Sequence, residues 1–332
     1  MNPAKRIVLL LTVAVGLAAD GRACSPDGHV FVALAAIEKL KQSNEPAARR
    51  LAAVLEKHRW VVCHGSEAPD WVQNERKYEY SHYMVLFRVS YESPQAFDLK
   101  VAQPVFTALL RDCYRLNYGL MPEDRAKFKP ALYTEPSPQK REIGLAFAAG
   151  YISHLLADYF CHRPALTWWE KDPIMQEATK RARPGQSYGP IQSVFAAFLW
   201  QSHAKAYGIS DELRKGPAEV DDAKQDNGAL PFCALACSRK FYQGWGIDAE
   251  KFVAPDKYEA CARPMTGRGH LRNCINNYRK ETRDIFDATG RSFEENLRIG
   301  TELTPWKKVY DDVIAMIAKT WANAAPAIAI GQ

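Results

Sequence analysis

The 332-residue sequence has very little of the alternation between polar and apolar residues that marks β-strands. Residues 83–89 are one weak candidate for a strand. The chain also lacks an internal repeat, a low-complexity segment and any apolar run of the roughly 18 residues that a membrane-spanning helix needs. These absences disfavour β-rich, repetitive and membrane-spanning folds.

A strong charge of one sign is missing as well. The formal net charge is +6, and residues 1–23 contribute +2 of it through three basic residues and one acidic residue. The remaining +4 makes residues 24–332 only mildly basic. Such a chain is compatible with an anionic substrate or a membrane surface, but it does not indicate nucleic-acid binding.

Helical periodicity is what the sequence does contain, because apolar residues recur at intervals of three and four in many segments. This pattern predicts helices over residues 28–40, 45–58, 93–120, 140–163, 191–206, 271–286 and 306–324. Residues 63–70, 121–140 and 171–190 are rich in Gly, Pro or charge and are predicted to be loops, and 209–230 is polar. We therefore expect an all-α fold, with one multi-helix domain over residues 24–332 whose C-terminal half, 165–332, carries no readable function.

The N-terminus has the pattern of a cleaved signal peptide. Lys5 and Arg6 precede an apolar segment over residues 7–19, and the small residues Gly21 and Ala23 lie at positions −3 and −1 of a cut before Cys24. Residues 1–23 are therefore predicted to be removed. The mature protein is expected to be secreted or periplasmic.

All eight cysteines lie in the predicted mature chain. An even number in an oxidising compartment predicts disulfides, and eight cysteines allow 105 connectivities. Cys261 with Cys274, and Cys233 or Cys237 with another late cysteine, are candidate pairs. The Cys233-x3-Cys237 spacing has no matching pair of ligands downstream, so a zinc finger is not indicated.

The segment 150–164 carries three residues that can bind a metal, at intervals of four: His154, Asp158 and His162. On an α-helix each step of four residues rotates by only about 40°, so the three side chains share one face. Their neighbours are apolar, and burial of unpaired polar groups costs several kcal/mol each, which a transition metal would offset. We expect the helix to end at Arg163, because Pro164 disfavours helical geometry in the residue before it.

Three further metal-competent residues precede this helix: His29, Asp70 and His82. Taken alone, each has an ordinary structural interpretation, since a single His is commonly a surface side chain and Pro-Asp is common in turns. Their combination with the central segment makes them candidate ligands.

Together these pieces resemble the zinc-dependent phospholipase C family, which shares a superfamily with zinc-dependent single-strand nucleases. The resembling motifs are Cys24-x4-His29, Gly65-Ser-Glu-Ala-Pro-Asp70, His82 and Gly150-x3-His154-x3-Asp158-x3-His162. They occur in the family's order over the first half of the chain. The resemblance implies an all-α fold with a cluster of up to three zinc ions.

The resemblance also implies a role for each of these residues. One Zn²⁺ would be held by Asp70, His82, His154 and Asp158, and Asp158 would bridge to a second ion. The second ion would be held by His29 and by the terminal amine and carbonyl of Cys24. A third ion would use His162 and a downstream His-x3-Glu pair, but the segments in question contain Tyr188-x3-Gln192 and His203-x3-Tyr207 instead. Two zinc ions are therefore expected, and the third site is left open.

The implied activity is hydrolysis of a phospholipid head group by zinc-activated water, with Asp70 orienting the water or acting as general base. The partners would be a phospholipid or another phosphodiester, with transient contact to a membrane surface. A nuclease acting on single strands is an alternative that would use the same metals. A secreted protein with a degenerate metal site and little catalysis is a third possibility, favoured by the missing His-x3-Glu pair.

Several other residues carry weaker predictions. His64 and Glu67 are candidates for orienting the ligands. His58 and His270 lie among charged residues and are expected to be solvated. Trp168 and Trp169 are expected to pack in the core, with the rim of the site as the alternative.

Overall fold

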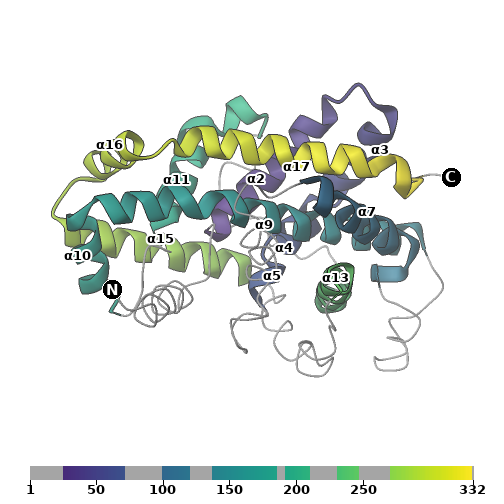
Figure 1. Cartoon of the computed structure of the whole chain (residues 1–332), viewed down its shortest axis with the longest axis horizontal. Helices are drawn as coiled ribbons and strands as arrows, with labels where there is room; N and C mark the ends of the chain where they lie inside the picture. Colours follow the sequence, from purple (N-terminus) through teal and green to yellow (C-terminus); the bar gives the residue numbers. More distant parts are fainter. Residues whose placement is uncertain are drawn as a thin grey trace, which may run out of the picture.

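The computed structural model describes residues 25–71, 99–119, 137–184, 191–209, 230–246 and 270–330, and within these ranges every regular element is helical. The prediction of an all-α fold is confirmed. In Figure 1 the two long helices α9 (Pro138–Lys171) and α17 (Trp306–Ile328) run lengthwise through the molecule, in contact with each other. The weak strand candidate at residues 83–89 lies outside the described residues.

The core is built where α2 (Pro26–Lys41) and α7 (Leu99–Arg115) meet α9 and α17. Helix α2 is buried on all sides over residues 26–37, which fits its mostly apolar sequence. It starts where Ser25 has extended backbone angles and Pro26 occupies the first turn. Helix α3 (Pro46–Lys57) is amphipathic and covers one side of α2. These two helices match the predicted ranges closely.

The predicted end of the central helix was wrong. Ser137 caps α9 by accepting a hydrogen bond from the Lys140 amide, and the helix continues through Pro164 to Lys171. A proline inside a helix removes one backbone hydrogen bond and strains the turn before it, but it does not forbid helix if the next turn is anchored. Here the next turn is anchored by Trp168, whose side chain is completely buried.

The predicted loop at residues 63–70 was also wrong. It forms two short helices, α4 (Arg59–Gly65) and α5 (Ala68–Trp71), joined by a tight turn. The backbones of α4 and α9 approach each other closely where the two helices cross. A Cβ atom on Gly65 would lie 2.3 Å from the carbonyl oxygen of Phe147, and one on Gly150 would lie 2.1 Å from that of Val62. The two glycines therefore permit a crossing that any larger residue would block.

One short described element, η4 (Asn117–Gly119), precedes α9 in sequence, and the remaining ones follow α9. They are α10 (Pro173–Ala182), α11 (Gln192–Phe198), η7 (Leu199–His203), η8 (Ala204–Tyr207), α13 (Leu230–Gly244), α15 (His270–Thr289) and α16 (Phe293–Leu303). The predictions for 191–206, 271–286 and 306–324 match helical segments. The prediction of a loop over 171–190 was wrong at α10, and α13 and α16 were not predicted.

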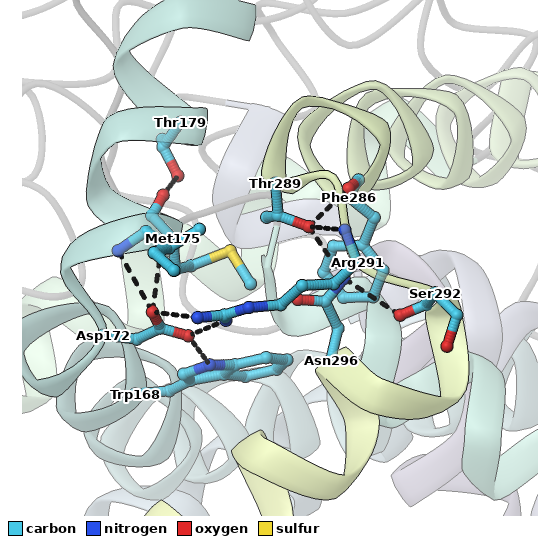
Figure 2. Close-up of polar contacts among 10 residues, drawn as sticks. Trp168, Asp172, Met175, Thr179, Phe286, Thr289, Arg291, Ser292 and Asn296 are labelled. Carbon is cyan, nitrogen blue, oxygen red and sulfur yellow. Dashed lines mark hydrogen bonds and ion pairs between the residues drawn. The ribbon is translucent and has the colours of Figure 1, made fainter.

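A buried polar cluster fixes the turn between α9 and α10 to the turn before α16 (Figure 2). The Asp172 carboxylate accepts hydrogen bonds from the backbone amides of Ile174 and Met175, which caps α10. The guanidinium of Arg291 donates to both oxygens of Asp172, at 2.6 and 3.2 Å, and the indole of Trp168 donates at 3.3 Å. Trp168 therefore packs in the core, as predicted in preference to the rim of the site. Its indole also donates a structural hydrogen bond.

Within the described ranges, no helix combines the length and the hydropathy that crossing a bilayer requires. The predicted signal peptide, residues 1–23, lies outside those ranges and stays a prediction, as does the assignment of 24–332 to one domain.

Candidate metal centre

Four of the predicted ligands from three separate helices meet in the interior. His29 comes from α2, Asp70 from α5, and His154 and Asp158 from α9. One ligand atom each of His29, Asp70 and His154 lies within 4.8 Å of the others. All three side chains are buried, and so is Asp158. A cluster of imidazole and carboxylate groups at this spacing can surround one ion.

The carboxylate of Asp158 approaches the Nε2 atoms of both imidazoles. Its Oδ1 is 3.2 Å from Nε2 of His29, and its Oδ2 is 3.1 Å from Nε2 of His154. The Nε2 atom of His154 also lies 3.7 Å from Oδ1 of Asp70. The two imidazole rings are stacked, with centroids 3.9 Å apart and planes at 11°. The side chains of His154 and Asp158 share one face of α9, as their spacing of four residues predicted.

A backbone carbonyl orients His154. Its Nδ1 lies 2.7 Å from the carbonyl oxygen of Ser66, at the turn between α4 and α5. A carbonyl can only accept, so Nδ1 carries the proton, and in the neutral ring Nε2 then presents a lone pair to the cluster. This contact depends on the close crossing at Gly65 and Gly150. Sequence reasoning missed Ser66, because a main-chain carbonyl has no sequence signature, although the two glycines were a usable signal.

The surroundings of the two histidines in the cluster shift their pKa values in opposite directions. Burial alone would lower the pKa of His154, but the carboxylates of Asp158 and Asp70 outweigh it and raise that pKa to about 9. Burial and the neighbouring charge of His154 lower the pKa of His29. Without a metal, a proton on His154 thus compensates the buried carboxylates. A divalent cation placed among them would take over that compensation.

The residues present fit a zinc ion. Neither ring nitrogen of His29 makes a hydrogen bond of good geometry within the described residues, despite the approach to Asp158, and Oδ1 of Asp70 makes none either. Buried polar atoms left in this state are costly, and two of them, Nε2 of His29 and Oδ1 of Asp70, lie close to other members of the cluster. Imidazole nitrogen and carboxylate oxygen are also ligands that zinc takes readily.

The N-terminal turn of α2, which presents His29, is held from the opposite side. The buried carboxylate of Asp27 lies 3.2 Å from Nε of Arg279 on α15, and the indole of Trp200 donates to the Asp27 carbonyl at 3.0 Å. Burial raises the pKa of Asp27, although the charge of Arg279 opposes that shift. These contacts position the turn from which His29 reaches the cluster.

A cavity of about 540 Å³ lies between α11, α15 and α16, and its described lining includes none of the metal candidates. Arginines 279, 283 and 291 are among the residues that line it. Arg279 and Arg291, however, already form ion pairs with the buried carboxylates of Asp27 and Asp172. Their positive charge serves the fold, so the cavity does not replace the metal centre as the candidate site.

The other predicted site residues fall into two groups. Cys24 and His82 lie outside the described residues, and His162 lies on α9 with its side chain outside the described part. His64 and Glu67 are buried, and the charge of Glu67 adds to the raised pKa of His154. Their predicted role in orienting ligands, like the ligand roles themselves, stays a prediction.

The prediction that His58 is solvated was wrong. Its side chain is buried, and its Nε2 lies 2.9 Å from a carboxylate oxygen of Glu142 on α9, which Lys57 also contacts. The acidic residue lies 84 positions away in sequence, so the local charge pattern could not reveal it. His270 begins α15, and its side chain is outside the described part.

In a comparison with known protein families, residues 28–199 match the family described as zinc-dependent phospholipase C. The match covers more than half of the chain, and it includes every described residue of the cluster. No curated protein and no solved structure gives a significant match.

Proposed function

The chain belongs to the zinc-dependent phospholipase C family, and from this premise we propose that it is a zinc-dependent hydrolase of phospholipid phosphodiester bonds. The observation that carries the proposal is the buried cluster of His29, Asp70, His154 and Asp158. Two imidazoles and two carboxylates from three helices provide a preorganised donor set for the cation that the family requires.

Zinc would be held by His29, Asp70, His154 and Asp158. Asp158 places one carboxylate oxygen toward each imidazole. The family resemblance adds Cys24, His82 and His162 to this set. When bound, zinc would lower the pKa of a water molecule and neutralise negative charge on the phosphoryl oxygens. Two ions are proposed, and a third would need partners that the sequence does not offer.

The protein's own groups would supply orientation and proton transfer. The Ser66 carbonyl fixes the ring of His154, so its Nε2 keeps one direction while a substrate binds. Asp70 is the most exposed of the four clustered residues, at 9%, and its Oδ1 has no hydrogen bond within the described residues. That oxygen is therefore suited to accept a proton from the attacking water, which is the role proposed for Asp70.

The test combines metal content with two substrates. Purified protein should contain about two zinc ions per chain by elemental analysis, and should hydrolyse short-chain phosphatidylcholine. A chelator should abolish that activity, and added zinc should restore it. Zinc below one ion per chain would contradict the proposal. Cleavage of single-stranded DNA without cleavage of the lipid would identify the nuclease alternative, and bound zinc with neither activity would identify a degenerate site.

We also propose that the protein is exported and acts in the periplasm or outside the cell, on the basis of the pattern in residues 1–23. Its cleavage site matters for the metal centre, because a free amine on Cys24 could coordinate while an acylated one could not. Sequencing the N-terminus of the exported protein tests this directly. A first residue other than Cys24 would refute the role of that residue.

A further inference from the structure

A second group of side chains that can carry chemistry lies between α7 and α13. Cys113 on α7 and Cys233 and Cys237 on α13 are all completely buried. The Sγ atoms of Cys113 and Cys237 are 3.9 Å apart, although the two residues are separated by 124 positions in sequence. Two thiols that meet inside a folded core need only about 2 Å of further approach to reach the length of a disulfide bond.

The packing around this pair favours close approach. Gly119, in η4, has a φ of +75°, and a Cβ there would lie 2.9 Å from Sγ of Cys113 and 3.3 Å from Cβ of Ala236. At the end of α13, a Cβ on Gly244 would lie 2.5 Å from a methyl carbon of Val105 on α7. Glycine at both places lets the two helices come together with the thiols between them.

We propose that Cys113 and Cys237 are joined by a disulfide bond that cross-links α7 to α13. The bond forms by exchange with a small-molecule disulfide such as oxidised glutathione. One protein thiolate attacks that disulfide and releases one thiol, and the second protein thiolate then displaces the other, so two protein thiols are oxidised while one disulfide is reduced to two thiols.

Cys233 is the third cysteine of this group. It lies four residues before Cys237 on the same helix, and it does not complete a three-thiol metal site. Within the described ranges, the metal centre is the one group of three metal-competent atoms that all lie within 4.8 Å of one another. The pair of Cys113 and Cys237 is therefore suited to oxidation rather than to metal binding.

Burial determines when the bond can form. It raises the pKa of the Cys237 thiol well above its usual range, with the neighbouring Cys113 adding to the shift, so the reactive thiolate is scarce in the folded protein. The exchange is therefore expected during folding, before α13 closes over α7. Once formed, the bond is shielded from reductants by the same burial.

The cross-link bears on the region of the metal centre through the packing of α13 against α9. The hydroxyl groups of Tyr151 on α9 and Ser238 on α13 lie 3.2 Å apart, and Ser238 follows Cys237 directly. Tyr151 precedes His154 by three residues. Holding α13 to α7 thus holds it against the part of α9 that carries the predicted ligands.

The experiment is a peptide map of the full chain, refolded with oxidised and reduced glutathione and digested without reduction after free thiols are alkylated. Mass spectrometry should find the peptide of Cys113 linked to that of Cys237, with Cys233 alkylated. Alkylation of both Cys113 and Cys237, or a link from either to another cysteine, would overturn the proposal. Wild-type protein is sufficient for this measurement.

Stability supplies a second readout. Thermal unfolding of oxidised protein should occur about 5 °C or more above that of protein folded under reducing conditions. Cys113→Ser should reduce this difference, and Cys233→Ser, the matched control on α13, should preserve it. The bond should also resist dithiothreitol in buffer and yield to it in denaturant. A difference as large in Cys113→Ser as in the wild type would contradict the assignment, and if that variant does not fold, the wild-type peptide map decides.

Discussion

Two buried carboxylates, one on α9 and one just after its end, have contrasting surroundings. Asp158 contacts two imidazoles and lies in a cluster with a second carboxylate, that of Asp70. Asp172, which follows α9 directly, receives a guanidinium, two backbone amides and an indole. The two lie 14 residues apart, roughly 21 Å along a helix at 1.5 Å per residue.

The two clusters differ in how the carboxylate charge is balanced. In the Asp172 cluster the protein's own groups balance it, whereas the Asp158 cluster needs a cation. Burial would raise the pKa of Asp172, but hydrogen bonds from Arg291 and the Met175 amide outweigh burial and hold that pKa below its usual value. At the other cluster the carboxylates instead raise the pKa of His154 to about 9. The Asp172 cluster therefore stabilises the fold, whereas the Asp158 cluster suits metal binding.

The largest expected effect comes from Asp158→Asn. The amide cannot supply negative charge to a cation, so zinc content and phospholipid hydrolysis should both fall, the latter on the order of 100-fold or more. Elemental analysis and the activity assay on short-chain phosphatidylcholine measure these losses. Unchanged zinc content would refute the bridging role of Asp158. Asp172→Asn is the matched control, since it makes the same substitution at the other cluster.

Gly150→Ala tests whether the α4–α9 crossing orients His154. A methyl group 2.1 Å from the Val62 carbonyl must push α4 away and carry Ser66 with it. Zinc affinity, measured by competition with a chelating dye, should fall about 10- to 100-fold. Gly300→Ala is the control, because its methyl would meet the Trp168 ring at 2.7 Å and disturb only the Asp172 cluster. Equal zinc affinities in both variants would contradict the role of Ser66.

Asp172→Asn should lower the free energy of unfolding by about 3 kcal/mol without changing the zinc content of the folded protein. Asparagine can still cap α10, but it leaves the largely buried Arg291 without its counter-charge. Asp172→Ala should cost about 1 kcal/mol more, since the cap is lost as well. Denaturant unfolding measures both values. A loss of zinc in folded Asp172→Asn protein would show that the two clusters are not independent.

The smallest effect is a pH dependence. Because the pKa of Asp172 is lower in the folded than in the unfolded chain, its stabilisation is fully present above the unfolded value of about 3.9. It is lost as pH falls through the folded value. The difference in unfolding free energy between wild type and Asp172→Asn should thus be constant above about pH 5 and shrink below about pH 4. A difference that grows on acidification would contradict the sign of this shift.

Much of the metal centre was predictable from short-range spacing. The interval of four between His154 and Asp158 specifies a shared helix face whatever else the chain does, and the structure confirms that the two lie together. His29 and Asp70 were predicted through the resemblance, and the structure brings them to the same cluster. The Ser66 contact and the His58–Glu142 pair were missed, because each joins residues more than 80 positions apart.

The fold was predictable in class and less so in detail. Apolar residues at intervals of three and four indicated helices at both ends of the chain, and α2 and α17 are found there. Local breaker signals misled in three places: Pro164 lies inside α9, residues 63–70 are largely helical, and α10 lies within the loop predicted over 171–190. At Pro164 and at residues 63–70, contacts from distant segments override a local preference of about 1 kcal/mol for glycine and about 3 kcal/mol for proline.

By itself, the sequence determined that the chain is helical and that α9 presents His154 and Asp158 on one face, because helix periodicity is a local property. Only the tertiary structure decided which buried carboxylate is neutralised within the protein. Asp172 meets Arg291 from 119 residues away, and Asp158 meets His29 from another helix. The spacing of four between His154 and Asp158 marks Asp158 as a candidate ligand, but no local pattern shows which groups balance the charge of either aspartate, since the energy of a buried charge depends on which distant groups the fold brings to it.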